Sequence, residues 1–275
     1  METFSSYEQF KKKVLAHLSE SNPQPWGIFA GNGKPYSHIV NIPKGSSQED
    51  IIKQILTKDK VNPDMFTSPH RYAHHLNSSQ VVCYEFFRNL ITEQKRVSVE
   101  LVKCLKQMGI PGDLFADGFA RFEWIPYKEE NTNFDFYIHA TNPSQKIYFE
   151  IKYTEQGFGV CKNDEEHKKK FGTIYKDMID KCACLSKIPT KFNDEWIKNY
   201  QLFRNVLRIT KENWQNEYVV FLFPKMNLTA KKHFEKFKAE YINSAFKDHI
   251  KEVFWEDLCA SMADTFRKKY FFYTI

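Results

Sequence analysis

The chain has 275 residues, of which 42% are hydrophobic and 16% aromatic, and its formal net charge is +6. This composition excludes a globally disordered chain and favours a well-packed protein with one large domain, or one domain with a modest extension. The small positive charge is compatible with a polyanionic partner but is also ordinary for a cytoplasmic enzyme.

The N-terminal residues METFSSYEQFKKKV lack the apolar core of a signal peptide. No apolar run approaches the roughly 20 residues that a bilayer span requires. The cysteines form no CxxC pairs and have no histidines at zinc-site spacing, so neither a zinc site nor a disulfide framework is predicted. We therefore expect a cytoplasmic protein, with no membrane association and with reduced cysteines.

The N-terminal part is expected to be mainly helical. A first helix is predicted over residues 6–19, followed by a stretch with Gly and Pro over residues 25–43. A second helix opens with the capping pattern Ser46-Ser-Gln-Glu49. The motif Gly31-Asn-Gly-Lys34 lacks the full spacing of a phosphate loop and is interpreted as a plain turn.

Two more helices are predicted before the pattern changes, one capped by Asn77 and one running from Ser98 to Gly109. From Gly118 the short aromatic runs GFARFEWIPY, FDFYIHA and KIYFEIKYT predict three adjacent strands. A Lys-rich segment over residues 163–181 precedes a helix near 195–209, the apolar strand EYVVFLFP, a helix around 229–246 and a short strand near 253–255. The predicted order is α, β, β, β, α, β, α, β. Residues 1–70 are predicted to be a helical extension and residues 71–275 the main domain.

Two carboxylates and a lysine stand on adjacent predicted strands. Asp135 belongs to the strand that begins at Phe134, and Glu150 and Lys152 belong to the next strand, after a polar turn. Residues two apart on a strand share a face, so Glu150 and Lys152 project together, while Ile151 points into the core and leaves its carbonyl oxygen available to a metal. We expect these groups to converge on one site.

Phosphodiester hydrolysis would use each of these groups. Mg²⁺ prefers carboxylate, carbonyl and water oxygens, and it can neutralise phosphate charge and lower the pKa of an attacking water. Asp135, Glu150 and the Ile151 carbonyl supply such a ligand set. The Lys152 ammonium would orient the nucleophile and stabilise the charge of the transition state. The sequence therefore favours a Mg²⁺-dependent nuclease with Asp135, Glu150 and Lys152 as catalytic residues.

An acidic residue two places before a lysine is a weak signal by itself. Glu93-Gln-Lys95 and Glu166-His-Lys168 share this spacing, but only Glu150-Ile-Lys152 lies on a predicted strand that follows another strand bearing a carboxylate. The alternative for the trio is a surface ion pair on a half-exposed sheet, worth about 0–1 kcal/mol.

A predicted helix adds candidate phosphate contacts. Gln201, Arg204 and Arg208 lie on one stripe of the helix near residues 195–209, and the opposite side is apolar. This stripe could bind the nucleic-acid backbone, and the alternative is a solvated helical face.

Three segments carry a resemblance to a known family: Leu76-Asn-Ser-Ser-Gln80, Phe149-Glu-Ile-Lys-Tyr-Thr-Glu155 with Gly157-Phe-Gly159, and Tyr200-Gln-Leu-Phe-Arg-Asn205. Together they resemble a bacterial group of restriction endonucleases in the PD-(D/E)xK superfamily, over about residues 70–260. The resemblance implies an α/β (α+β) fold with a central mixed sheet flanked by helices. It also implies Mg²⁺-dependent cleavage of DNA, with Asp135, Glu150 and Lys152 as the active-site trio, and a partner methyltransferase.

The sequence departs from the superfamily motif at one position, and two further acidic residues have more than one possible role. Asp135 follows Phe134, where the superfamily motif has a proline. In the superfamily an acidic residue on the helix before the strands sometimes joins the metal site. Glu85 is the candidate here, and a solvent-facing glutamate is the alternative. Glu155 is expected to support the site or to cap the strand end.

Two clusters of basic residues have no assigned chemistry. His70, His74 and His75 lack further ligands at metal-site spacing and are interpreted as helix-surface residues that could meet phosphate. The run Lys168-Lys-Lys170 is interpreted as a solvated face, with a DNA contact as the alternative.

The resulting hypothesis is a Mg²⁺-dependent DNA endonuclease of the restriction or defence type. Two alternatives stay open: a non-catalytic nucleic-acid-binding module with a nuclease-like fold, and a nuclease acting on RNA or branched DNA, because phosphate contacts report neither sugar nor base. A homodimer would suit cleavage of a palindromic site.

Overall fold

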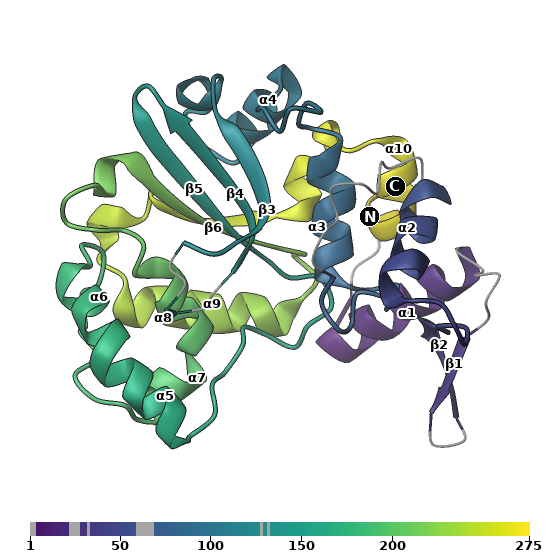
Figure 1. Ribbon diagram of the computed structural model, residues 1–275, viewed down its shortest axis with the longest axis horizontal. Coiled ribbons are helices and arrows are strands. Elements are labelled where there is room, and N and C mark those ends of the chain that lie inside the picture. The colour runs from purple at the N-terminus through teal and green to yellow at the C-terminus, as the bar shows by residue number, and fades with distance from the viewer. Residues whose placement is uncertain (1–3, 22–27, 32–33, 59–68, 127–128, 131–132) are drawn as a thin grey trace.

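A mixed β-sheet forms the centre of the computed structural model (Figure 1). Within the residues that the structure describes, 4–21, 28–31, 34–58, 69–126, 129–130 and 133–275, five strands make up this sheet in the order β3-β4-β5-β6-β7. The β3-β4 and β4-β5 pairs are antiparallel, and the β5-β6 and β6-β7 pairs are parallel. The strands are β3 (Phe119–Trp124), β4 (Phe134–Thr141), β5 (Ser144–Ile151), β6 (Glu217–Phe223) and β7 (Ile250–Phe254).

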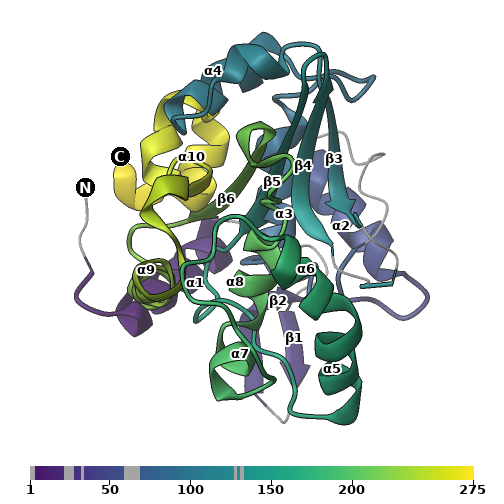
Figure 2. The ribbon, with the colours of Figure 1, turned by 90° about the vertical axis from the view of Figure 1, so that its left-hand side faces the viewer.

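Helices cover both faces of the sheet (Figures 1 and 2). One face packs in a hydrophobic cluster with α3 (Ser79–Arg88), α4 (Val99–Gln107) and α10 (Asp264–Tyr270). The other face packs with α6 (Lys176–Lys181), α7 (Asp194–Lys198), α8 (Tyr200–Val206) and α9 (Leu228–Tyr241). The short helix α5 (Glu165–Lys170) precedes α6 and buries none of its own residues. Every residue of β6 is buried, because this strand is covered on both faces and has a neighbour on each side. The predicted α/β fold with a central mixed sheet is confirmed.

The N-terminal part adds α1 (Tyr7–Ser21), an antiparallel hairpin of β1 (Ile28–Gly31) and β2 (Lys34–Val40), and α2 (Gln48–Lys58). The hairpin occupies the predicted Gly- and Pro-containing stretch, and the two central residues of the expected turn lie outside the described part of the chain. On α1, Phe10, Val14 and Leu18 are fully buried in the same cluster as strands of the main sheet. Residues on both sides of position 70 thus share one core, and the domain boundary there stays a prediction.

Several helix boundaries differ from the expected ones. Ser78, rather than Asn77, caps α3, since its side chain accepts the Val81 N–H. The helix expected over 195–209 is divided into α7 and α8 at Asn199. The Lys-rich segment forms α5 and α6, joined by a π-helical turn over Phe171–Tyr175. Short 3₁₀ segments complete the chain at Gly112–Phe115, Trp214–Asn216, Ser244–Phe246, Trp255–Ser261 and Phe272–Thr274. None of the helices in the described ranges is both long enough and apolar enough to cross a membrane.

Candidate active site

Three carboxylates form one row across the antiparallel half of the sheet. Phe122 pairs with Phe136, and Phe136 pairs with Phe149. Continued by one position, the β4-β5 register places Asp135 beside Glu150 on one face of the sheet. Glu123 lies between Phe122 and Trp124, whose partners on β4 flank Asp135, and so completes the row. The φ angle of Glu123 is 51°, in the left-handed region that a non-glycine residue seldom occupies and that is often associated with functional sites.

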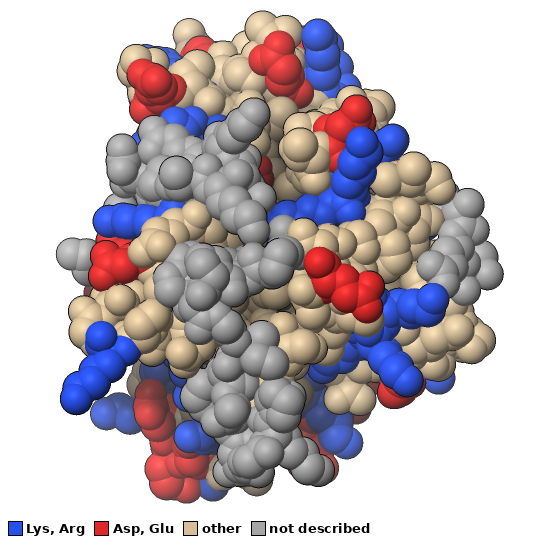
Figure 3. Space-filling view, turned by 90° about the vertical axis from the view of Figure 1, so that its right-hand side faces the viewer, with Lys and Arg blue, Asp and Glu red and all other residues tan. Residues whose placement is uncertain are grey.

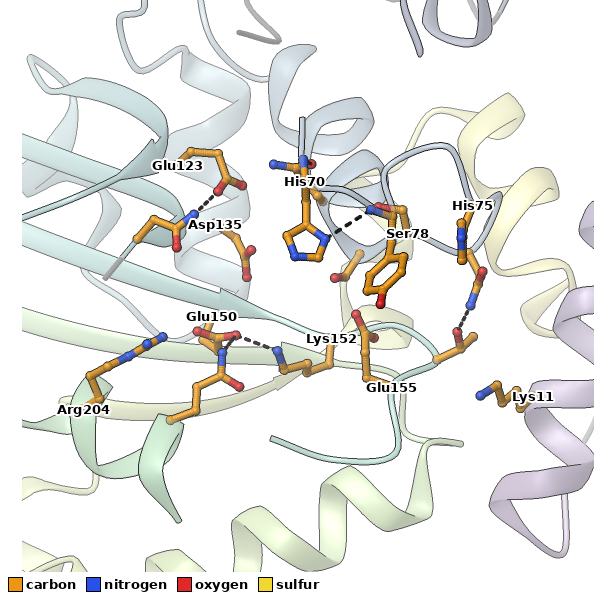
Figure 4. Close-up of a pocket in the computed structure, with 17 residues that line it drawn as sticks. Lys11, His70, His75, Ser78, Glu123, Asp135, Glu150, Lys152, Glu155 and Arg204 are labelled. Atoms are coloured by element: carbon orange, nitrogen blue, oxygen red, sulfur yellow. Dashed lines mark hydrogen bonds and ion pairs between the residues drawn. The ribbon is translucent and has the colours of Figure 1, made fainter. Parts of the chain in front are cut away.

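The carboxylate row lies in a cleft of about 460 Å³ (Figure 4). The sheet forms one wall, α8 another, and residues 70–80 and α1 the opposite side. Lys152 projects from the end of β5 into the same cleft. The structure thus brings together the predicted residues Asp135, Glu150 and Lys152. The lining residues are Lys11, His70, Tyr72, His75, Asn77, Ser78, Ser79, Gln80, Glu123, Asn133, Asp135, Glu150, Lys152, Thr154, Glu155, Gln201 and Arg204.

Glu150 is only 3% exposed, and three side chains donate hydrogen bonds to its carboxylate. The Lys152 Nζ and the Gln201 Nε2 donate to its Oε1 at 2.8 and 2.7 Å, and the Asn205 Nδ2 donates to its Oε2 at 2.8 Å. The Gly159 N–H donates in turn to the Gln201 Oε1 at 2.6 Å. A Cβ at Gly159 would lie 3.2 Å from that same oxygen, so glycine allows this close approach.

The other two carboxylates are crowded in a partly buried environment. The Asp135 Oδ2 accepts the Ile151 N–H at 2.6 Å. Burial raises the pKa of Asp135 well above its ordinary value, and nearby Glu150 and Glu123 add to the shift. Burial also raises the pKa of Glu123 to about 7, although hydrogen bonds from Gln80 and Asn133 favour its ionised form. Ionisation of these neighbouring carboxyl groups is therefore disfavoured, and a bound cation would favour it.

Lys152 has its charge stabilised by this environment. Burial lowers the pKa of its ammonium, but Glu150, Glu155 and Asp135 raise it by more, so that the net shift is upward. The Lys152 side chain is 12% exposed and makes an ion pair with Glu150. It therefore acts as a positive charge in the cleft rather than as a proton acceptor.

The donor set is consistent with a hard divalent cation. Among the described residues, no three His, Cys, Asp or Glu side chains converge closely enough to complete a metal site by themselves. Mg²⁺ seldom requires such a cage, because it is typically bound through one or two carboxylates, with water and substrate phosphate as further ligands. The row of carboxylate oxygens fits that pattern. The side chain of Ile151 is fully buried and does not line the cleft, and its carbonyl as a metal ligand stays a prediction.

The predicted supporting residues differ in their positions relative to the cleft. Gln201 and Arg204 line the cleft, as does Glu155, whose Oε2 caps the strand end by accepting the Tyr153 N–H at 2.6 Å.

Arg208 does not line the cleft. It is 3% exposed, forms an ion pair with Glu130 and lines a second cavity, so its predicted position on one phosphate-facing stripe with Gln201 and Arg204 is wrong, as is a solvated face. The helix ends at Val206, and Arg208 therefore leaves the stripe.

Glu85 is also displaced from its predicted place. It is 3% exposed and bonds to the Lys269 Nζ of α10 at 2.8 Å, on the opposite face of the sheet from the carboxylate row. Neither the metal-site assignment nor the solvent-facing alternative holds. The third carboxylate of the site is Glu123, on β3 rather than on the preceding helix.

Glu123 and Asn205 are the site residues that the sequence analysis did not assign. Glu123 is an acidic residue inside an aromatic strand, directly across from Asp135 in the meander. Asn205 follows Gln201 by four residues, a spacing that places both on one side of a helix. The strand register with Asp135 could have indicated Glu123, and the helical spacing from Gln201 could have indicated Asn205.

The two basic clusters have different positions. His70 and His75 line the cleft, but residues 71–77 form turns and an isolated bridge to β2 rather than the expected helix surface. In the lysine run, Lys168 and Lys170 pair with Glu165 and Glu166 on exposed helical turns outside the cleft. This agrees with a solvated face.

Comparison with protein families yields one match. The model of a family described as REase-ARP, Restriction Endonuclease associating with ARP, matches residues 37–271. The matched range includes the carboxylate row, Lys152 and the donors from α8. No curated protein and no solved structure matches the chain.

Proposed function

The chain belongs to the family of restriction endonucleases associating with ARP, and on that premise we propose that it is a Mg²⁺-dependent endonuclease that hydrolyses phosphodiester bonds of DNA. The observation that carries this proposal is the row of Glu123, Asp135 and Glu150 beside the ammonium of Lys152. Negative oxygens to bind a cation and a positive nitrogen to meet a phosphate occupy one cleft. The family description supports a defence role, and ARP is the proposed associate.

Asp135, Glu150 and the Ile151 carbonyl would hold Mg²⁺, with Glu123 as a further oxygen donor. When bound, the cation would neutralise phosphate charge and lower the pKa of an attacking water. Gln201 and Asn205 fix the direction of the Glu150 carboxylate. Arg204, on the α8 wall, would hold the neighbouring phosphate.

Lys152 would meet the scissile phosphate with its ammonium. In hydrolysis the water oxygen bonds to phosphorus, the bond from phosphorus to the 3′ oxygen breaks, and 5′-phosphate and 3′-hydroxyl ends result. A fixed positive charge is most valuable where negative charge develops in the transition state. The burial of Lys152 strengthens this effect, because little water screens the interaction.

The test is incubation of mixed-sequence plasmid DNA with purified protein in Mg²⁺ or in EDTA. Wild type is expected to cut only in Mg²⁺, and Lys152→Ala to lose cutting by at least about 100-fold. The matched control is Lys146→Ala, since Lys146 lies on the same strand but pairs with Glu217 outside the cleft. Full activity in Lys152→Ala would overturn the site. Binding without cleavage of duplex, single-stranded or RNA substrates would favour the non-catalytic module.

A further inference from the structure

The wall of the cleft opposite α8 carries aromatic rings. His70, Tyr72 and His75 line the cleft from the segment that follows the N-terminal part (Figure 4). The ring of Tyr72 lies 5.3 Å from that of His70 and 5.2 Å from that of His75. Rings of β2 extend the series, because His38 lies 5.9 Å from His75 and Tyr36 lies 6.3 Å from His38. We call these five residues, Tyr36, His38, His70, Tyr72 and His75, the aromatic wall.

The aromatic wall is held by backbone hydrogen bonds. The Val40 N–H donates to the His74 carbonyl at 3.2 Å, and the Leu76 N–H donates to the His38 carbonyl at 2.8 Å, so the segment is joined to β2. The His70 N–H donates to the Gln80 Oε1 at 2.7 Å. The rings are thus presented by a preformed surface, and binding to them requires little ordering of the chain.

The tyrosines of the aromatic wall are accessible. Tyr72 is 46% exposed and Tyr36 is 39% exposed, unusual values for large aromatic side chains. The guanidinium of Arg71 lies 4.4 Å from the centre of the Tyr72 ring. An exposed ring with an adjacent cation is a typical surface for base stacking in proteins that bind single strands.

The histidine rings of the aromatic wall add little positive charge that would bind a duplex backbone. Burial lowers the pKa of the His38, His70 and His75 imidazoles, for His75 to about 4. Within the described part of the chain, Lys11, Arg71 and Lys152 are the cations that act on these rings. Figure 3 shows the side of the molecule that carries the N-terminal elements, where Lys and Arg side chains are interspersed with Asp and Glu side chains. Proteins that grip duplex DNA instead neutralise several phosphates with clustered cations.

Stacking on the aromatic wall requires a base whose face is free. In a paired duplex the base faces are stacked inside the helix and cannot reach Tyr72. An unpaired nucleotide can present its base to the aromatic wall while its phosphate faces Lys152.

We propose that the aromatic wall binds an unpaired base by stacking, and that single-stranded DNA, or duplex with an unpaired segment, is the substrate class of the cleft. This inference rests on the proposed nuclease function for the identity of the ligand. It assigns Tyr72 as the principal stacking residue, because this ring is the more exposed of the two tyrosines and lines the cleft itself.

The test measures binding in EDTA, where no cleavage is expected. Fluorescence anisotropy compares a labelled mixed-sequence single strand of DNA, a duplex of the same length and the corresponding RNA. Wild type should bind the DNA single strand at least about 10-fold more tightly than the duplex. Tyr72→Ala should lose roughly 5- to 150-fold of that affinity, since stacking on one base is worth about 1–3 kcal/mol, and Tyr72→Phe should retain it.

The matched control is Phe119→Ala. Phe119 is 39% exposed and also has a guanidinium over its ring, that of Arg96 at 4.0 Å, but it lies outside the cleft. Equal affinity for duplex and single strand, tighter binding to RNA than to DNA, or the same loss in Phe119→Ala as in Tyr72→Ala would overturn the inference. Cutting in Mg²⁺ is scored separately, on the DNA single strand as well as on the plasmid. Cutting of either substrate with no effect of Tyr72→Ala on binding refutes the aromatic wall and leaves the nuclease. A Tyr72-dependent preference with no cutting of either substrate refutes the nuclease and leaves the aromatic wall.

Discussion

Glu150 shows how this site depends on a few exact contacts. Its two oxygens accept hydrogen bonds from Lys152, Gln201 and Asn205, so its direction is set by two different elements. Asn205 is fully buried and its side-chain amide donates to Glu150. It does not line the cleft, which makes it a positioning residue.

Replacing Asn205 should therefore weaken metal use rather than DNA binding. We expect Asn205→Ala to raise the Mg²⁺ concentration needed for half-maximal cutting by about 10- to 100-fold, as is typical when a partner of a metal ligand is removed. Cutting rates over a Mg²⁺ titration check this, and DNA affinity in EDTA should stay unchanged. The exposed Asn213→Ala is the control. An unchanged Mg²⁺ midpoint in Asn205→Ala would refute the positioning role.

Helix α8 ends before the predicted polar stripe is complete. Arg204 stays on the helix and lines the cleft, whereas Arg208 follows the helix end and is buried against Glu130. Two arginines four residues apart thus have different roles. The physical reason is that a stripe continues only as far as the helix that generates it.

The two arginines can be separated by experiment. Arg208→Ala should lower the free energy of unfolding by about 3–5 kcal/mol, because it leaves a buried carboxylate without its partner. Arg204→Ala should change stability by less than about 1 kcal/mol and weaken binding to all DNA sequences, with a smaller salt dependence. Urea unfolding and DNA binding at several salt concentrations measure these effects. Loss of binding with normal stability in Arg208→Ala would restore its predicted phosphate contact.

At the scale of the whole molecule, the N-terminal helix shares its core with the rest of the chain. Phe10 is fully buried between the rings of Phe4 and Tyr273, at 5.7 and 5.9 Å. The Tyr7 hydroxyl also donates to the Thr154 carbonyl at 2.8 Å, just beyond the end of β5. The start of the chain therefore supports the loop that follows Lys152.

This shared core predicts cooperative unfolding. Phe10→Ala should lower the unfolding free energy by about 3–5 kcal/mol within a single transition, since cavity formation in a common core affects the whole protein. Thermal unfolding followed by near- and far-ultraviolet circular dichroism measures this, with the exposed Glu8→Ala on the same helix as the control. A separate early transition in Phe10→Ala would instead indicate an independent N-terminal unit.

Much of the fold could be predicted because it depends on local pattern. Alternating aromatic residues predicted β3, β4 and β5, and a fully apolar run predicted β6. The elements that were predicted occur in the predicted order, but the β1-β2 hairpin and α10 were not predicted. The family match confirms the resemblance to a restriction endonuclease group. The helices at residues 165–181 were missed because frequent lysines obscured the apolar spacing of Phe171, Tyr175 and Ile179.

The sequence by itself determined the three-strand meander and the projection of Glu150 and Lys152 to one side, because both follow from the two-residue period of a strand. Only the tertiary structure decided which distant groups join them. The pairing of β3 with β4 brings Glu123 to the site, and the packing of α8 brings Asn205. The segment joined to β2 brings the aromatic wall. Glu85 and Arg208 lie outside the site, and each bonds to a buried partner, 184 and 78 residues away in the chain respectively. Such contacts depend on how elements pack, and no local period in the sequence encodes them.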